Sequence, residues 1–416
     1  MTGERGEGLL SGLRVIEVSM LGPAAITTAL ADLGAHVIKV EPPTGDYVRQ
    51  MTWPIIEGVS LMHLHINRGK RSIAIDLKTD EGIGLFLDLV RESDVVVEAM
   101  RPGGLARRGL GFDKLREVNP RIVQCTISGY GATGPYRNLA SHGIAYDAWA
   151  GIFAPELDDA GYPSIPDHVS IGINAGPLFG ALGILAAVIH ARETGTGSQL
   201  ELAQSDAAAA FDWYRSETVR AYQRPESEVT GNKSDGYARR EPAIAGMRGG
   251  VRYQLYASSD GHVLFMASEQ HFWKKFCEGV GRQELFERWP GSLYGDHARG
   301  NRELQAELTE IFGQRTTDEW IAFAIDTDVP IAPVNTPGTL ADDPQFADRL
   351  SWIPEDVLGA DELPFPVKIA GMELPTPTHA PEVGEHSDEV LRDVLHLDDE
   401  RIAELRAAGA VHGPRA

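Results

Sequence analysis

The sequence predicts an α/β protein: a large domain built on a mostly parallel sheet, and a smaller α+β domain. Three observations predict it. Short apolar strands alternate with helical segments from Leu13 to Ser128, which is typical of a parallel sheet with helices on its faces. A hairpin pattern replaces this alternation in the middle of the chain. The 416 residues, 43% of them hydrophobic, can bury a sizeable core.

The first domain is expected to begin with a strand, a helix and a second strand. A glycine, Gly34, follows the first helix, and glycine commonly ends helices. Ligands of parallel sheets bind at the carboxyl ends of the strands, here Ser19–Pro23, Glu98–Gly103 and Ser128–Gly131. The expected strands are Leu13–Val18, Val37–Val40, Asp94–Glu98 and Arg121–Ser128, and the expected helices are Ala24–Leu33 and Glu81–Glu92.

The rest of the chain is expected to form the smaller domain and a returning segment. Two strands are expected around the turn Ser259–Gly261, within Tyr253–Met266. We expect a large domain over 1–222, a small domain over 223–328, and a linker and C-terminal segment over 329–416 that returns to the large domain. Further expected elements are helices at Asp206–Tyr222, His271–Gly281, Asn301–Gln314 and His386–Val394, and a strand at Phe365–Ile369.

Composition excludes several classes of protein. The net charge of −22 disfavours nucleic acid and anionic membranes as partners, because the protein repels phosphates at long range. Cys125 and Cys277 are too few for a disulfide framework or a cysteine-built metal site, so a reducing cytoplasm is expected. The residues from Met1 to Leu9 do not resemble a secretory signal. The apolar run Ala175–Ala191 is shorter than the ~20 residues that span a bilayer, which favours a buried helix.

The opening strand, turn, helix and strand ending in Glu41 suggest a dinucleotide site. Such sites need several glycines, so that the backbone can approach a pyrophosphate. The turn here has only Gly22, and Pro23 removes an N–H donor. A parallel-sheet scaffold without nicotinamide explains the pattern better.

Several motifs run in order over nearly the whole chain. They include Leu21–Pro23, Leu33–Glu41, Asn67–Ser72, Met100–Gly103, Ile127–Pro135, Gly183–Ala187, Arg192–Ser198, Val329–Val334 and Gly384–Leu391. Together they resemble the family III coenzyme A transferases (CaiB/BaiF, formyl-CoA transferase-like). The resemblance implies a Rossmann-like large domain, an obligate dimer of interlocked chains, no permanently bound cofactor and no metal. Coenzyme A and acyl-CoA would be substrates.

Coenzyme A carries a pyrophosphate and a 3′-phosphate, so its site needs cations. A group of basic residues lies near the expected ligand edge, and a solvated basic face is the alternative explanation for it: Lys70, Arg71, Arg101, Arg107 and Arg108. By family position, Arg71 and Arg107 would contact phosphate. Ala99 and Met100 would lie against the nucleotide and pantetheine.

Three further positions have a functional and a structural interpretation. His142 falls where the racemase branch of the family has a proton-transferring histidine, or it is structural. Asp147 would line the acyl pocket, with helix capping or a surface position as the alternatives. Gly249–Gly250 would be a lid over the site or a simple turn.

One departure from the family concerns its catalytic carboxylate. Members use an aspartate, just before a glycine- and alanine-rich helix, that attacks the thioester, forms a mixed anhydride and then an aspartyl-CoA thioester. Counting back from Gly183 puts that position at Gly172 or Ile173, or at Asn174 after a local shift. None of these can form an anhydride, and Asp167 could substitute only if the loop is rebuilt.

Three functions follow from these residues. The first is a coenzyme A-binding subunit of a heteromeric transferase, whose homologous partner chain supplies the aspartate. Its model is the two-subunit succinyl-CoA:benzylsuccinate type. The second is a self-sufficient transferase using Asp167, or an isomerase or racemase using His142. The third is a non-catalytic homodimer that binds acyl-CoA.

Overall fold

The computed structural model describes residues 8–233, 236–241, 243–293 and 295–414. The chain divides into two compact units, 1–212 with 350–416 and 213–349. From the sequence the boundaries are expected after residues 222 and 328. They lie elsewhere because α8 (Trp213–Ala221) packs on η5 (Ala243–Met247), and because β13 (Ile331–Pro333) pairs with β12 (His262–Met266) of the second unit.

In the described residues, the first unit is built on a seven-stranded sheet. All neighbouring strands are parallel except β14, which runs antiparallel to β5 and covers that edge. The predicted α/β fold with a mostly parallel sheet is therefore confirmed. The order is β10 (Gln199–Ala203), β7 (Val123–Ser128), β6 (Val95–Glu98), β1 (Arg14–Val18), β2 (His36–Glu41), β5 (Arg71–Ile75) and β14 (Val411–His412).

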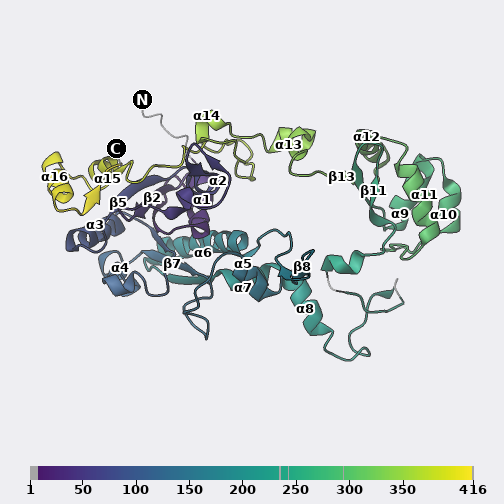
Figure 1. Ribbon diagram of the computed structural model, residues 1–416, viewed down its shortest axis with the longest axis horizontal. Coiled ribbons are helices and arrows are strands. Elements are labelled where there is room, and N and C mark those ends of the chain that lie inside the picture. Colours follow the sequence, from purple (N-terminus) through teal and green to yellow (C-terminus); the bar gives the residue numbers. More distant parts are fainter. Residues whose placement is uncertain (1–7, 234–235, 242, 294, 415–416) are drawn as a thin grey trace. The chain divides into compact units, whose positions relative to one another are not determined.

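Helices cover both faces of this sheet. On one face, apolar side chains of the strands pack against α3 (Asp80–Arg91), α4 (Phe112–Val118), α15 (Ser387–Asp393) and α16 (Asp399–Ala407). Figure 1 shows the C-terminal pair, in yellow, beside β5 and α3. On the other face lie α1 (Ala25–Asp32) and α6 (Gly172–Thr194).

The apolar run of the sequence forms α6. By length and composition this helix could cross a membrane, but half of its most apolar window is buried within the protein. Its small residues pack against α1 and the sheet, whereas Leu178, Leu182 and Ile189 are 59%, 65% and 59% exposed. One face of α6 therefore belongs to the core and the other is apolar and uncovered.

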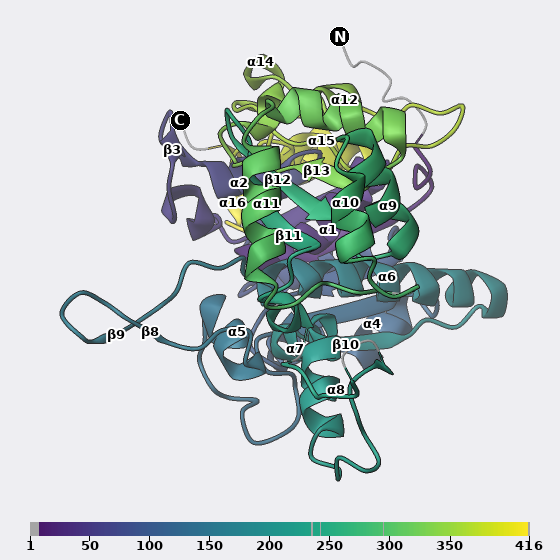
Figure 2. The same cartoon turned by 90° about the vertical axis from the view of Figure 1, so that its right-hand side faces the viewer.

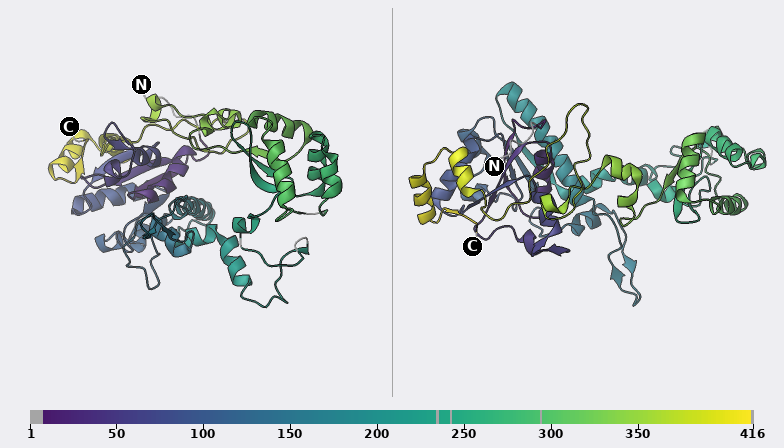
Figure 3. Two further views of the ribbon diagram at one scale, coloured as in Figure 1. Left: turned by 45° about the vertical axis from the view of Figure 1, so that its right-hand side comes forward. Right: turned by 90° about the horizontal axis from the view of Figure 1, so that it is seen from above.

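Short elements complete the first unit. The β8–β9 hairpin extends away from the sheet (Figure 3). These elements are η1 (Gly22–Ala24), η2 (Tyr47–Gln50), β3 (Ile55–Ile56), β4 (Val59–Ser60), α2 (Leu61–Asn67), η3 (Ala106–Arg108), α5 (Ile144–Ala150), β8 (Glu156–Leu157), β9 (Pro163–Ser164), α7 (Gln204–Phe211) and α14 (Glu355–Leu358).

The second unit has its own core. The hairpin predicted around Ser259–Gly261 is present, and β13 adds a third, antiparallel strand. Helices surround this sheet (Figure 2), and aromatic residues fill the space between them. The elements are β11 (Tyr253–Ala257), α9 (Gln270–Gly279), α10 (Gln283–Arg288), α11 (Arg302–Phe312), α12 (Thr317–Thr327), η6 (Leu340–Asp342) and α13 (Pro344–Arg349).

Two predicted elements are wrong. The helix expected over Asp206–Tyr222 ends at Phe211, and α8 begins at Trp213 in the other unit. The strand expected at Phe365–Ile369 is absent from this described segment, where one isolated bridge joins Ile369 to Met372. An alternating apolar pattern makes a strand only where a partner strand is available, and none lies alongside this segment.

A fully buried charge cluster joins the first strands of the sheet. Glu17 Oε1 lies 2.9 Å from Lys39 Nζ, and Glu17 Oε2 lies 2.7 Å from Lys70 Nζ. Lys39 also donates to Ser19 O at 2.9 Å, and Lys70 to Ala24 O at 2.8 Å. The two ammonium groups therefore hold both ends of the loop that follows β1.

The pKa values show how strongly these charges depend on one another. Burial raises the pKa of Glu17, but Lys39 and Lys70 outweigh that effect and hold it at about 2. Burial, with nearby Lys39, lowers the pKa of Lys70 to about 8 despite Glu17. Burial also acts against protonated Lys39, but Glu17, Asp46 and Glu41 raise its pKa above the usual range. Nearby carboxylates thus stabilise the positive charge of Lys39 more strongly than that of Lys70.

We expect Glu17→Gln to cost about 3–5 kcal/mol of folding free energy, because it leaves two buried ammonium groups without their shared carboxylate. Urea denaturation at fixed protein concentration measures this loss. Glu92→Gln, which removes the exposed partner of Arg14, should cost only about 0–1 kcal/mol. Because the pKa of Glu17 is lowered, its contribution is complete above pH 4.5 and declines toward pH 2. Equal losses in the two variants would contradict this role.

Candidate active site

The strand order places a crevice at the carboxyl ends of β1 and β6. The chain leaves β1 for β2 on one side, while β6 lies on the other, so the loops after these strands diverge. Ala99 N donates to Val18 O at 3.1 Å, which joins the two strand ends. In the loop after β1, Leu21 has φ 59° and ψ −154°. Such a conformation is ordinarily adopted only by glycine, and strain of this kind gathers at functional sites.

The start of α6 meets this crevice loop. A Cβ on Gly22 would lie 3.7 Å from Ile173 Cβ, and one on Gly143 would lie 2.8 Å from Ile173 Cγ2. Ile173 is the second residue of α6. Segments around residues 22, 143 and 173 therefore come together, and the close approach at Gly143 leaves no space for a side chain there.

Asp147, on α5, caps the start of α6. Its buried Oδ1 accepts hydrogen bonds from Gly172 N at 2.7 Å and Ile171 N at 3.1 Å. Two backbone donors that the helix itself cannot satisfy are thus paired. Of the interpretations that the sequence left open for Asp147, the structure places its carboxylate in helix capping.

His168, which was not a candidate in the sequence analysis, lies beside Asp147. His168 Nε2 lies 3.4 Å from Asp147 Oδ2, and His168 Nδ1 lies 3.0 Å from Pro166 O. Both ring nitrogens thus face oxygen atoms. The pair joins residues 21 positions apart, so no local sequence pattern marks it.

Gly172 is one of the three positions, with Ile173 and Asn174, where the sequence comparison expects the catalytic aspartate of the family. A Cβ at Gly172 would lie 2.8 Å from Tyr146 Cβ and 3.4 Å from Asp147 Oδ1. Asn174 is exposed, and its Nδ2 donates to Ser170 O at 2.6 Å. The weaker candidates, Asp167 and His142, are exposed in the loops before α6 and α5.

The expected coenzyme A contacts lie in two places. Ala99 and Met100 are half-buried directly after β6. Arg107 is exposed, and its Nη1 donates to Pro102 O at 2.9 Å. Arg71 begins β5, three strands from β6, or about 14 Å at the usual strand spacing. A molecule as long as coenzyme A can span that distance.

Two basic residues are already engaged. Arg71 Nη1 lies 3.2 Å from Glu389 Oε1, in a half-exposed ion pair. Lys70 belongs to the buried cluster with Glu17, so its proposed place in a phosphate-binding group is wrong. No group of three or more His, Cys, Asp and Glu side chains within the described residues could hold a metal ion.

We expect Gly172→Asp to destabilise the protein by about 1–3 kcal/mol, because the new side chain overpacks against Tyr146 and approaches the Asp147 carboxylate. Asn174→Asp, at an exposed position on the same helical turn, should change the stability by less than about 0.5 kcal/mol, because a negative charge in the first turn of the helix offsets the lost hydrogen bond to Ser170 O. Urea denaturation of both variants compares them directly. A Gly172→Asp protein as stable as the parent would mean that the site has room for a carboxylate.

Comparison with known proteins identifies the family. Residues 10–387 match the model of CoA-transferase family III. The chain is 31% identical over 409 residues to the succinyl-CoA–L-malate CoA-transferase alpha subunit of Chloroflexus aurantiacus, covering 96% of this chain and 91% of the relative. It is 29% identical to the beta subunit from a strain of that species, covering 96% and 97%.

A solved structure agrees with these sequence matches. The crystal structure of a CaiB/BaiF family protein from Brucella suis superimposes with a TM-score of 0.75 at 27% identity, covering 94% of this chain and all of that one. Enzymes of this family take coenzyme A thioesters as substrates and need no permanently bound cofactor. With the fold, the crevice loops and these matches in agreement, the chain belongs to the family III CoA-transferases.

Proposed function

We propose that this chain is the coenzyme A-binding subunit of an acyl-CoA transferase that moves coenzyme A from an acyl-CoA to a carboxylic acid. A homologous partner chain would supply the catalytic aspartate. The observation that carries this proposal is the start of α6, where Gly172 has no space for a side chain and the nearby Asp147 carboxylate caps the helix.

Asp147 is a poor nucleophile in this arrangement. Attack on a thioester needs an accessible carboxylate oxygen, and the Asp147 side chain is fully buried. Two backbone N–H groups also stabilise its charge through Oδ1. We therefore assign Asp147 to holding the first turn of α6 in place, beside the proposed acyl pocket, rather than to chemistry.

The names of the relatives suggest the donor and the partner. Two of them are alpha and beta subunits of a transferase that uses succinyl-CoA. We propose succinyl-CoA as the first donor to test and a homologous chain as the partner. A location in the cytoplasm, where acyl-CoA is made and used, is consistent with this function.

The exposed apolar face of α6 supports association with another chain. Leu178, Leu182 and Ile189 would lie in water on a single chain, and contiguous apolar patches commonly mark interfaces. We propose that this face contacts the homologous chain, or a second copy, in an interlocked dimer whose assembly is inseparable from folding. A folded monomer in sedimentation at low micromolar concentration would exclude it.

We expect Arg71→Ala and Arg107→Ala each to weaken coenzyme A binding about 10- to 100-fold, the range for a lost charge-assisted hydrogen bond to phosphate. Calorimetric titration measures the affinities. Glu389→Gln should tighten binding, because it frees Arg71 from its ion pair. Arg401→Ala, an exposed arginine of α16, is the control and should have no effect. Unchanged affinity in both alanine variants would remove these arginines from the site.

We expect no covalent mark on this chain after incubation with succinyl-CoA and trapping with hydroxylamine or borohydride, since a trapped intermediate requires a nucleophilic carboxylate. In a complex with an aspartate-bearing homologue, the mass shift should appear on the homologue alone. A mass shift on Asp167 would instead make the chain a self-sufficient transferase. Deuterium entering the α-carbon of an acyl-CoA, catalysed by the chain alone and lost in His142→Ala, would indicate an isomerase or racemase.

If the complex neither transfers coenzyme A nor carries a mark, while coenzyme A still binds the chain, a non-catalytic binding function remains. Transfer from succinyl-CoA to a dicarboxylic acid by the two chains together, and by neither alone, is the result that we expect.

A further inference from the structure

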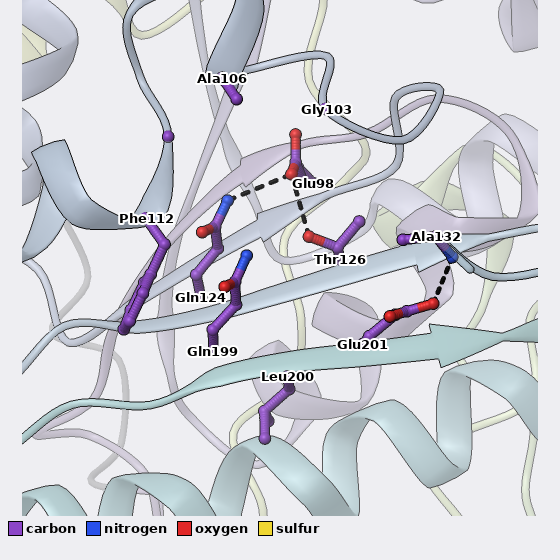
Figure 4. Close-up of a pocket in the computed structure, with 11 residues that line it drawn as sticks. Glu98, Gly103, Ala106, Phe112, Gln124, Thr126, Ala132, Gln199, Leu200 and Glu201 are labelled. Carbon is purple, nitrogen blue, oxygen red and sulfur yellow. Dashed lines mark hydrogen bonds between the residues drawn. The ribbon is translucent and has the colours of Figure 1, made fainter. Parts of the chain in front are cut away.

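A cavity lies beside the loop after β6, residues 99–108, on the sheet face that carries α3 and α4. Figure 4 shows residues that line this cavity, and its volume is about 350 Å³. The floor consists of polar side chains on three adjacent strands, Glu98 on β6, Gln124 and Thr126 on β7, and Gln199 and Glu201 on β10. The parallel register places Gln124 beside Gln199 and Thr126 beside Glu201, so these side chains share one face. Part of the rim comes from η3 and the start of α4.

One buried group in this cavity lacks a partner. Gln124 is 1% exposed, and its Nε2 donates to Glu98 Oε1 at 3.1 Å. Its Oε1 has no hydrogen-bond partner among the described residues, and Gln124 is one of the residues that line the cavity. A buried carbonyl oxygen without a donor destabilises the folded protein. A ligand that brings a donor would remove this cost.

The cavity offers acceptors and negative charge. Glu98 is buried and accepts hydrogen bonds from Thr126 Oγ1 at 2.9 Å and from Leu105 N at 3.3 Å. Glu201, on the exposed edge strand, accepts a hydrogen bond from Ala132 N through one of its oxygens. The lining contains two carboxylates and no lysine, arginine or histidine among the described residues. Burial raises the pKa of the Glu98 carboxyl, although its hydrogen bonds and Arg107, which lies outside the lining, act in the opposite direction.

We propose that this cavity binds a small ligand carrying a primary ammonium group. Such a group brings three N–H donors and a positive charge to a site whose unmet need is a donor at Gln124 Oε1. An anion such as a carboxylate or phosphate would face two carboxylates there. The site is thus opposite in charge preference to the coenzyme A site proposed at Arg71 and Arg107.

A ligand in this cavity would contact the loop after β6, which we propose also contacts coenzyme A. Residues 99–108 connect the end of β6 to η3, and both Gly103 and Ala106 line the cavity. Met100 and Arg107 belong to the same loop. Occupancy of the cavity would therefore favour one position of a segment that we propose contacts coenzyme A.

Three probes of similar length and different charge test the proposal. We use 1,4-diaminobutane, the neutral 1,4-butanediol and the dianion succinate, each titrated calorimetrically into the full-length protein at low ionic strength without coenzyme A. We expect saturable binding of the diamine at one site per chain and little binding of the diol. Succinate binding, if seen, should be insensitive to changes in this cavity.

Variants locate the binding. Glu201→Gln should weaken diamine binding by about tenfold or more, because it removes a charge from an exposed position without removing an acceptor. Gln124→Leu should weaken it also, and the exposed Glu201 keeps the test valid if that buried variant does not fold. Glu156→Gln, an exposed carboxylate on β8, is the control for unspecific attraction to the acidic protein.

The outcomes are distinct. A diol that binds as tightly as the diamine would overturn the ammonium class, and equal effects of Glu201→Gln and Glu156→Gln would overturn the location. If Arg71→Ala loses coenzyme A binding but still binds the diamine, the two sites are separate. The ammonium site is then supported independently of the coenzyme A site. A shift of the Gln124 side-chain amide resonance on diamine addition would support it directly.

Discussion

The carboxylate of Glu17, shared between Lys39 and Lys70, is the interaction on which the crevice depends. All three side chains are fully buried, and each lysine also binds a backbone carbonyl of the loop after β1. The loop that contains the strained residue Leu21 is therefore held in place by buried charges that water cannot screen. Removing one partner would leave a buried charge unpaired, so the three residues act as a unit.

This support has a consequence for the chemistry of the site. Lys70 would be a phosphate-binding residue if it were exposed, but it contributes to the scaffold instead. Asp147 is likewise an acidic residue beside the expected reaction centre, yet its charge stabilises the first turn of α6. Lys70 and Asp147, two charged residues near the crevice, thus stabilise the fold. For the coenzyme A site that we propose, the chain offers the exposed Arg107 and the half-exposed Arg71, which is paired with Glu389.

The two ligand sites that we propose differ in the charge of the residues that form them. Coenzyme A is a polyanion, and the acidic protein can bind it only through locally concentrated arginines. The cavity beside β10 has the opposite lining, with Glu98, Glu201 and the unpaired oxygen of Gln124. The loop from Ala99 to Arg108 lies between them, so a change in one site can alter the affinity of the other without direct contact between the ligands.

The sequence by itself determined the alternation of strands and helices, the hairpin of the second unit and the family, because these follow from local periodicity, turn residues and the order of motifs. The proposal that this chain lacks the catalytic carboxylate also comes from the sequence, since counting back from Gly183 needs no coordinates. A charged residue at equivalent places in two apolar strands, Glu17 in β1 and Lys39 in β2, was a signal that could have predicted the buried pair. Only the tertiary structure decided that Lys70 joins that pair, that Asp147 caps a helix 25 residues further along, and that β13 belongs to the second unit. Each of these depends on which segments meet in space, and local sequence does not encode the partner.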